Sequence, residues 1–101
     1  MNNRRWVILL MYDLPVGKRS AVSFMKNIKK LGYMRVQKSV YVKLLRNKRN
    51  VGPEINAVRE IRCLEGDIKI LPMQLDVFKK IVSISGDDFE LSYFANDVVV
   101  I

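Results

Sequence analysis

Residues 6–15 have the sequence WVILLMYDLP, in which seven consecutive apolar residues are followed by one aspartate, Asp13. An apolar run this short and continuous predicts a strand buried on both faces of a sheet. Asp13 is then expected where the strand emerges at its carboxyl end, the edge of an α/β sheet where ligands tend to bind. The basic residues Lys18 and Arg19 follow and open a helix. A carboxylate facing a cationic helix start suggests a site for a metal ion, a phosphate or both.

The composition restricts the chemistry that the chain can perform. A length of 101 residues predicts a single domain over residues 1–101, and the apolar half of these residues is enough for a core. Without histidine, imidazole acid–base chemistry and histidine metal ligation are excluded. The single cysteine, Cys63, can form no internal disulfide, and we expect a reducing, cytoplasmic setting. No stretch approaches the ~20 apolar residues of a membrane helix, so we expect no membrane partner.

Positive charge is concentrated in the middle of the chain, whose formal net charge is +8. From Lys18 to Arg62 there are thirteen lysines and arginines against two acids, Glu54 and Glu60. From Leu64 onward, three lysines face seven acids. A surface built only for solubility would mix the signs more evenly. The concentration favours a polyanion as partner, because each neutralised phosphate releases counterions.

The spacing of apolar residues predicts the order of the elements. Spacings of three and four indicate amphipathic helices, and strict alternation indicates strands. After the first strand we expect a helix over 17–31, strands over 34–37 and 40–44, a loop over 46–50, a helix from 52 to before 66, a strand over 67–71 ended by Pro72, a short helix closed by Gly86, a loop over 87–90 and a terminal strand within 97–101. This order predicts an α+β, ferredoxin-like β-α-β-β-α-β fold with an extra short helix and a C-terminal strand.

Several motifs of the first half resemble the Cas-two family of CRISPR-associated proteins, which take part in spacer acquisition. They are MYDLP (11–15), the helix opening GKR (17–19), LGYMRVQKSVY (31–41) and VKLL (42–45). Tyr12-Asp13 together with RVQ (35–37) and SVY (39–41) is far more specific than any one motif. The second half matches the family only in the order of its elements. The VKLL ending and the extra helix look most like members from type II systems.

The resemblance implies a function, a cofactor and partners. Proteins of this family form homodimers whose sheets face each other, which implies that residues 97–101 add a strand to the partner subunit's sheet. The family dimer binds a short DNA duplex through its backbone and bridges two dimers of the Cas-one integrase. Some members are also described as metal-dependent endonucleases on RNA or DNA. In that description the strand-end aspartates of two protomers share a divalent ion, which implies Mg²⁺ here.

Asp13 is the candidate catalytic residue and metal ligand. A hard cation prefers carboxylate oxygens and keeps several waters, and it would lower the pKa of a bound water near a phosphodiester. The residues alone slightly favour a turn residue ahead of Pro15 that hydrogen-bonds local amides. A nuclease site usually collects several carboxylates, and the next acid along the chain is Glu54. We therefore expect weak metal binding and leave nuclease activity open.

Cations of the helix start, the two middle strands and the following loop are the candidate nucleic-acid contacts. A groove that tracks a phosphate backbone needs such charges and no geometry for recognising bases. The candidates are Lys18, Arg19, Arg35, Lys38, Lys43, Arg46, Lys48 and Arg49.

A single-strand RNA reader is the weakest of the three candidate functions. RNA-recognition domains share the β-α-β-β-α-β order but carry aromatic residues and glycine on their third strand. The corresponding stretch here, SVYVKLL, has no glycine and one aromatic residue. We expect Tyr12 and Tyr41 to belong to the core or to a dimer interface and not to stack on bases.

Overall fold

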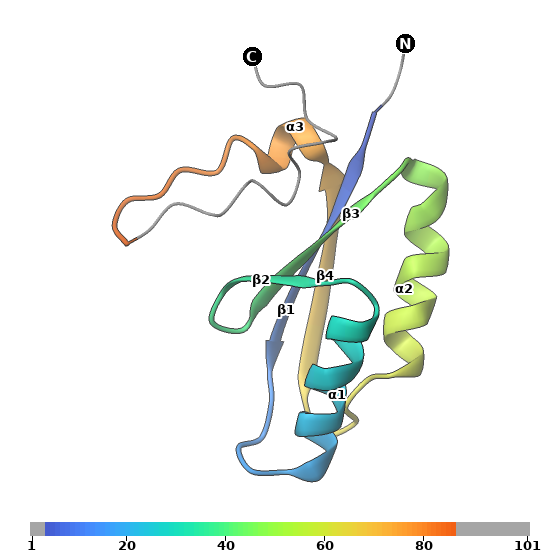
Figure 1. Ribbon diagram of the computed structural model, residues 1–101, viewed down its shortest axis with the longest axis vertical. Helices are drawn as coiled ribbons and strands as arrows, with labels where there is room; N and C mark the ends of the chain where they lie inside the picture. Colours follow the sequence, from blue (N-terminus) through green and yellow to red (C-terminus); the bar gives the residue numbers. More distant parts are fainter. Residues whose placement is uncertain (1–3, 87–101) are drawn as a thin grey trace.

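The computed structural model describes residues 4–86, which form a sheet with helices packed against it (Figure 1). Seven helices and strands follow one another in the predicted order, and a short 3₁₀ helix, η1, precedes the second long helix. The elements are β1 (Trp6–Asp13), α1 (Arg19–Lys30), β2 (Met34–Gln37), β3 (Val40–Leu45), η1 (Lys48–Asn50), α2 (Val51–Glu60), β4 (Asp67–Gln74) and α3 (Leu75–Phe78).

The sheet is antiparallel and has the strand order β2-β3-β1-β4. The strand β1 lies in the middle, and its register sets Trp6 opposite Leu45 of β3 and Asp13 opposite Asp67 of β4. The α+β, ferredoxin-like fold predicted from the sequence is therefore confirmed for residues 4–86. No helix within this range is long and apolar enough to cross a membrane.

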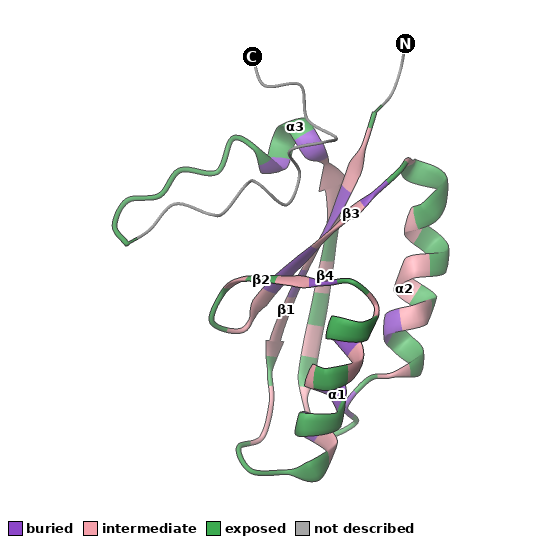
Figure 2. Cartoon of the chain, in the orientation of Figure 1, coloured by how far each residue is buried: buried purple, intermediate pink, exposed green. Residues whose placement is uncertain are grey.

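The two faces of the sheet are covered to different extents. On the helix face, Ile8 and Leu10 of β1 pack with Phe24 and Ile28 of α1 and with Val58 of α2. The opposite side, which we call the open face, is covered in part by α3. Its buried cluster consists of Val7, Val42, Leu75 and Phe78. Figure 2 shows that burial is concentrated in the central strands, which explains the unbroken apolar run of β1.

The prediction that Pro72 ends the fourth strand is wrong, because β4 continues to Gln74 with Pro72 opposite Ile8. Within residues 4–86, β4 is an edge strand that pairs with β1 alone. An edge strand has no neighbouring strand on one side, so a proline whose missing N–H faces that side costs no hydrogen bond.

Two further segments differ from the expectation. The predicted loop 46–50 contains η1, whose first residues are capped by the side chain of Asn47 and which continues directly into α2 at Val51. The predicted helix from Leu75 to Gly86 is shorter, since α3 ends at Phe78. Leu75 and Phe78 pack on the open face, whereas Ile81, Val82 and Ile84 are at least half exposed. The predicted loop 87–90 and terminal strand 97–101 lie outside the described residues.

A half-buried ion pair ties β3 to α2. The Lys43 Nζ donates to Glu54 Oε1 at 3.0 Å, with 22% of the Lys43 side chain and 11% of the Glu54 side chain exposed. The same ammonium group lies 5.7 Å from the centre of the Tyr33 ring. Burial first, and the neighbouring Glu54 charge second, raise the pKa of the Tyr33 hydroxyl. The second carboxylate oxygen, Glu54 Oε2, is buried and has no hydrogen-bond partner among residues 4–86, so Lys43 supplies the compensating charge.

Replacing Lys43 by methionine should destabilise the fold by about 1–3 kcal/mol, because the Glu54 carboxylate would stay buried without a cation. The double variant Lys43→Met/Glu54→Leu should recover most of that loss, since it removes both charges. Unfolding in urea measures each difference. The matched control is Lys26→Met on the exposed side of α1, which should change stability by less than about 0.5 kcal/mol. A Lys43→Met loss no larger than that of the control would contradict the structural role of the pair.

Candidate functional site

The carboxyl end of β1 brings together two aspartates that are far apart in the sequence. Asp13 is the last residue of β1 and is exposed, and its register partner is Asp67, the first residue of β4. Directly opposed residues of an antiparallel pair share one face of the sheet, and like charges there repel each other. Asp67 Oδ1 accepts a hydrogen bond from Lys69 Nζ at 2.6 Å, which reduces that repulsion.

Asp67 is a candidate functional residue that the sequence analysis missed. The predicted strand 67–71 contained the signal, because an antiparallel neighbour of β1 begins where β1 ends. Two carboxylates and several waters suit Mg²⁺, which is commonly bound through one or two carboxylates. Within residues 4–86 no group of three or more acidic, histidine or cysteine side chains could hold a metal ion. The donor set therefore fits a weakly held, largely hydrated cation.

Tyr12, next to Asp13, is partly buried and packs against the core cluster of the helix face. Its ring meets Phe24 edge-on at 5.9 Å and lies 6.0 Å from the ring of Tyr41, which is 2% exposed. Burial first, then the neighbouring Tyr41, raises the pKa of Tyr12 to about 12, against an opposing effect of Arg35. Both rings thus serve the core, as expected from the sequence.

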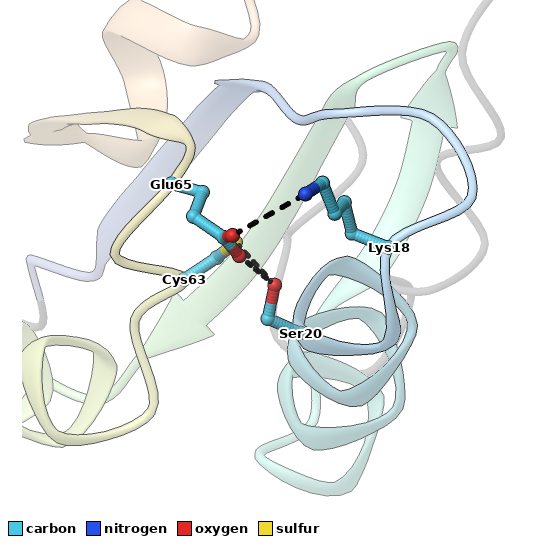
Figure 3. A network of polar contacts seen from close by, with 4 residues as sticks. All are labelled: Lys18, Ser20, Cys63 and Glu65. Atoms are coloured by element: carbon cyan, nitrogen blue, oxygen red, sulfur yellow. Dashed lines mark hydrogen bonds and ion pairs between the residues drawn. The ribbon is translucent and has the colours of Figure 1, made fainter.

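The start of α1 is linked to the loop between α2 and β4 (Figure 3). The carboxylate of Glu65 accepts a short hydrogen bond from the Ser20 hydroxyl, and its Oε2 lies 3.8 Å from Lys18 Nζ. The thiol of Cys63 donates to Ser20 Oγ at 3.5 Å. Lys18 is thus partly neutralised by an exposed carboxylate, whereas Arg19 is exposed and has no ion pair within the described residues.

The β2–β3 hairpin carries two more candidate cations toward the carboxyl end of β1, with Arg35 in strand β2 and Lys38 in the turn that follows it. Arg35 and Lys38 are exposed. The turn is closed by Ser39, whose backbone has a φ of 65° and whose carbonyl accepts the Tyr12 N–H at 3.1 Å. That hydrogen bond holds Lys38 beside the end of β1. A first basic group therefore consists of Lys18, Arg19, Arg35 and Lys38.

A second basic group lies at the opposite end of β1. Arg46 follows the residue paired with Trp6, and Lys48 Nζ lies 5.7 Å from the centre of the Trp6 ring. Arg49 belongs to η1, which is held by the reciprocal hydrogen bonds of Asn47 and Asn50. All three cations are exposed. Lys43 belongs to neither group, because its ammonium is paired with Glu54, and its predicted contact with nucleic acid stays a prediction.

Comparison with known proteins agrees with this architecture. The family model described as CRISPR associated protein Cas2 matches residues 5–81, which include every strand and long helix described above. No curated protein matches the chain closely. The matched segment contains both basic groups and the aspartate pair. Because the match covers more than half of the sequence, the chain belongs to the Cas2 family of CRISPR-associated proteins.

Proposed function

We propose that this protein is a structural DNA-binding subunit of CRISPR adaptation, which acts as a homodimer and bridges dimers of the Cas-one integrase. The observation that carries the proposal is that the exposed candidate cations form two groups, one toward each end of β1. At ~3.3 Å per residue, the eight residues of β1 separate the groups by about 23 Å. That is about two thirds of a helical turn of duplex DNA.

Both basic groups can be reached without crossing the open face. Arg35 lies opposite Tyr41, and Lys48 lies over Trp6. Tyr41 and Trp6 both contribute to the cluster on the helix face. A duplex that follows this side of the molecule would meet lysine and arginine at both ends. These side chains offer positive charge but no arrangement of groups that would recognise base edges. This supports sequence-independent contact with phosphates.

The open face supports the homodimer. Leu71 of β4 lies opposite Leu9 on this face and is 51% exposed. Beyond α3, the side chains of Ile81, Val82 and Ile84 are also at least half exposed. Apolar surface of this kind marks an interaction site in a chain of this size. A second copy with the same face would cover it on both protomers at once, as closed two-fold symmetry requires.

Mg²⁺-dependent cleavage of phosphodiesters is the second candidate function, and the alignment of Asp13 with Asp67 favours it. In that case the two carboxylates would hold the ion, which would polarise the phosphodiester and supply a hydroxide for attack. With so few ligands in one protomer, this activity would be weak. A second protomer would add its own Asp13.

Removing two cations of the first basic group should weaken DNA binding in a salt-dependent way. For the double variant Lys18→Gln/Arg19→Gln, we expect the slope of log K against log salt to become shallower by roughly 0.9 for each lost phosphate contact. Fluorescence anisotropy on a duplex of about 30 base pairs across a salt series measures this slope. The control Lys29→Gln/Lys30→Gln removes the same charge from the other end of α1. An equal change in both variants would show that only net charge matters.

Replacing Leu71 by aspartate should convert the dimer to a monomer, because a charge on the open face cannot be buried against a second copy. Sedimentation velocity measures the mass. Val22→Asp on α1 is the matched control, since Val22 is 53% exposed but lies on the helix side. A wild-type monomer, or a Leu71→Asp dimer, would contradict an interface at the open face.

Cleavage should depend on the aspartate pair. We expect Asp13→Asn to abolish Mg²⁺-dependent cleavage of end-labelled duplex DNA or single-stranded RNA, and Asp67→Asn to reduce it by about 10-fold or more. Duplex binding in the absence of Mg²⁺ should persist in both variants, because neither loses a cation. Cleavage by Asp13→Asn at the wild-type rate would rule out the metal site. No cleavage by any variant, with intact duplex binding, would leave the protein a structural subunit.

A further inference from the structure

A pocket between α2 and β4 has features that neither DNA binding nor the open face uses. It has a volume of about 440 Å³, within the range of sites that bind ligands or peptide side chains. Its apolar floor is formed by Ile55 of α2 and by Ile68 and Ile70 of β4. Leu64, in the connecting loop, lines the pocket and is 80% exposed.

Two arginines stand at the rim of this pocket. Arg59 donates to Asn56 Oδ1 at 2.7 Å, and Arg62 donates to the carbonyl oxygen of Arg59, also at 2.7 Å. These bonds orient the guanidinium groups without neutralising them. Among residues 4–86, neither arginine is paired with a carboxylate. The one acid in the lining, Asp67, accepts from Lys69, so the rim is positively charged.

The pocket combines an apolar floor with a positively charged rim, so it best fits an occupant that carries both an apolar group and negative charge. A phosphate backbone would satisfy Arg59 and Arg62 but would leave the isoleucine floor in contact with water. An apolar side chain alone would fill the floor and leave the arginines unused. A short peptide segment with a large apolar residue next to carboxylates satisfies both, in the way that peptide-binding grooves combine a pocket with charged contacts.

We propose that this pocket docks an acidic, leucine- or phenylalanine-containing segment of a partner protein. The site lies on the helix side, away from the open face, and therefore stays accessible when a second copy covers that face. The inference does not depend on DNA binding. The pocket at α2 and the loop after it would serve protein recognition, whereas the two basic groups toward the ends of β1 would serve nucleic acid.

The test uses three fluorescein-labelled peptides of equal length with the full chain. The first has a leucine–phenylalanine pair between glutamates, the second has lysines in place of the glutamates, and the third has serines in place of the apolar pair. By anisotropy, we expect the first to bind at least about tenfold more tightly than the others. Arg59→Gln/Arg62→Gln and Leu64→Ser should each weaken its binding by about tenfold or more.

The matched control is Lys29→Gln/Lys30→Gln, which removes the same charge from α1 and should leave peptide affinity within about twofold. Circular dichroism confirms that each variant is folded. Equal binding of the serine peptide, or an equal loss in the control, would overturn the proposal in favour of unspecific attraction to a basic protein. A loss of duplex DNA affinity in Arg59→Gln/Arg62→Gln beyond that of the control, without peptide binding, would overturn it in favour of nucleic acid.

Discussion

The pairing of β1 with β3 on one side and β4 on the other determines where every candidate site in this molecule lies. The strand lies in the middle of the sheet with Val7, Ile8 and Leu10 buried, and Asp13 at its carboxyl end is exposed. At its carboxyl end, Asp13 lies opposite the first residue of β4, and the preceding residue hydrogen-bonds to the β2–β3 turn. Its amino end supports Arg46 and the loop that leads into α2. A slip of one residue would turn Asp13 to the other face and separate it from Asp67.

Ion pairs within the protein decide which lysines and arginines are available to bind a polyanion. Lys43 is held by Glu54 under α2, where losing its partner would leave a buried charge. Lys18 shares an exposed carboxylate with Ser20, a contact of small energy that a phosphate can replace. The exposed cations at both ends of β1 keep their charge available. Arg59, in the last turn of α2, and Arg62, after it, differ from these because an apolar pocket lies beside them.

Much of the fold was predictable because the apolar pattern of each element matches its place in the sheet. The run 6–12, the spacing of Phe24 and Ile28, and the alternation over 40–44 each predict the observed element. The extent of β4 was not predictable, since Pro72 ends a central strand but is tolerated on an edge. The length of α3 depends on the sheet beneath Leu75 and Phe78, which no local pattern reveals.

The candidate site was predictable in part. Asp13 and the basic residues stand out by type and position along the chain. Their partners do not, because Asp67, Glu65 and Glu54 are brought to them by the register of β4 and the packing of α2. The resemblance of residues 6–45 to the Cas2 family, which is most specific in Tyr12-Asp13 together with residues 35–41, was confirmed by the family match.

The most informative experiment compares the wild-type chain on two duplexes of unrelated sequence and on a single strand of the same length, over a range of salt concentrations. Backbone recognition by two basic groups predicts equal affinity for both duplexes, weaker binding of the single strand, and a steep salt slope from several phosphate contacts. A strong preference for one duplex, a preference for the single strand, or an affinity independent of salt would contradict the function proposed for this protein.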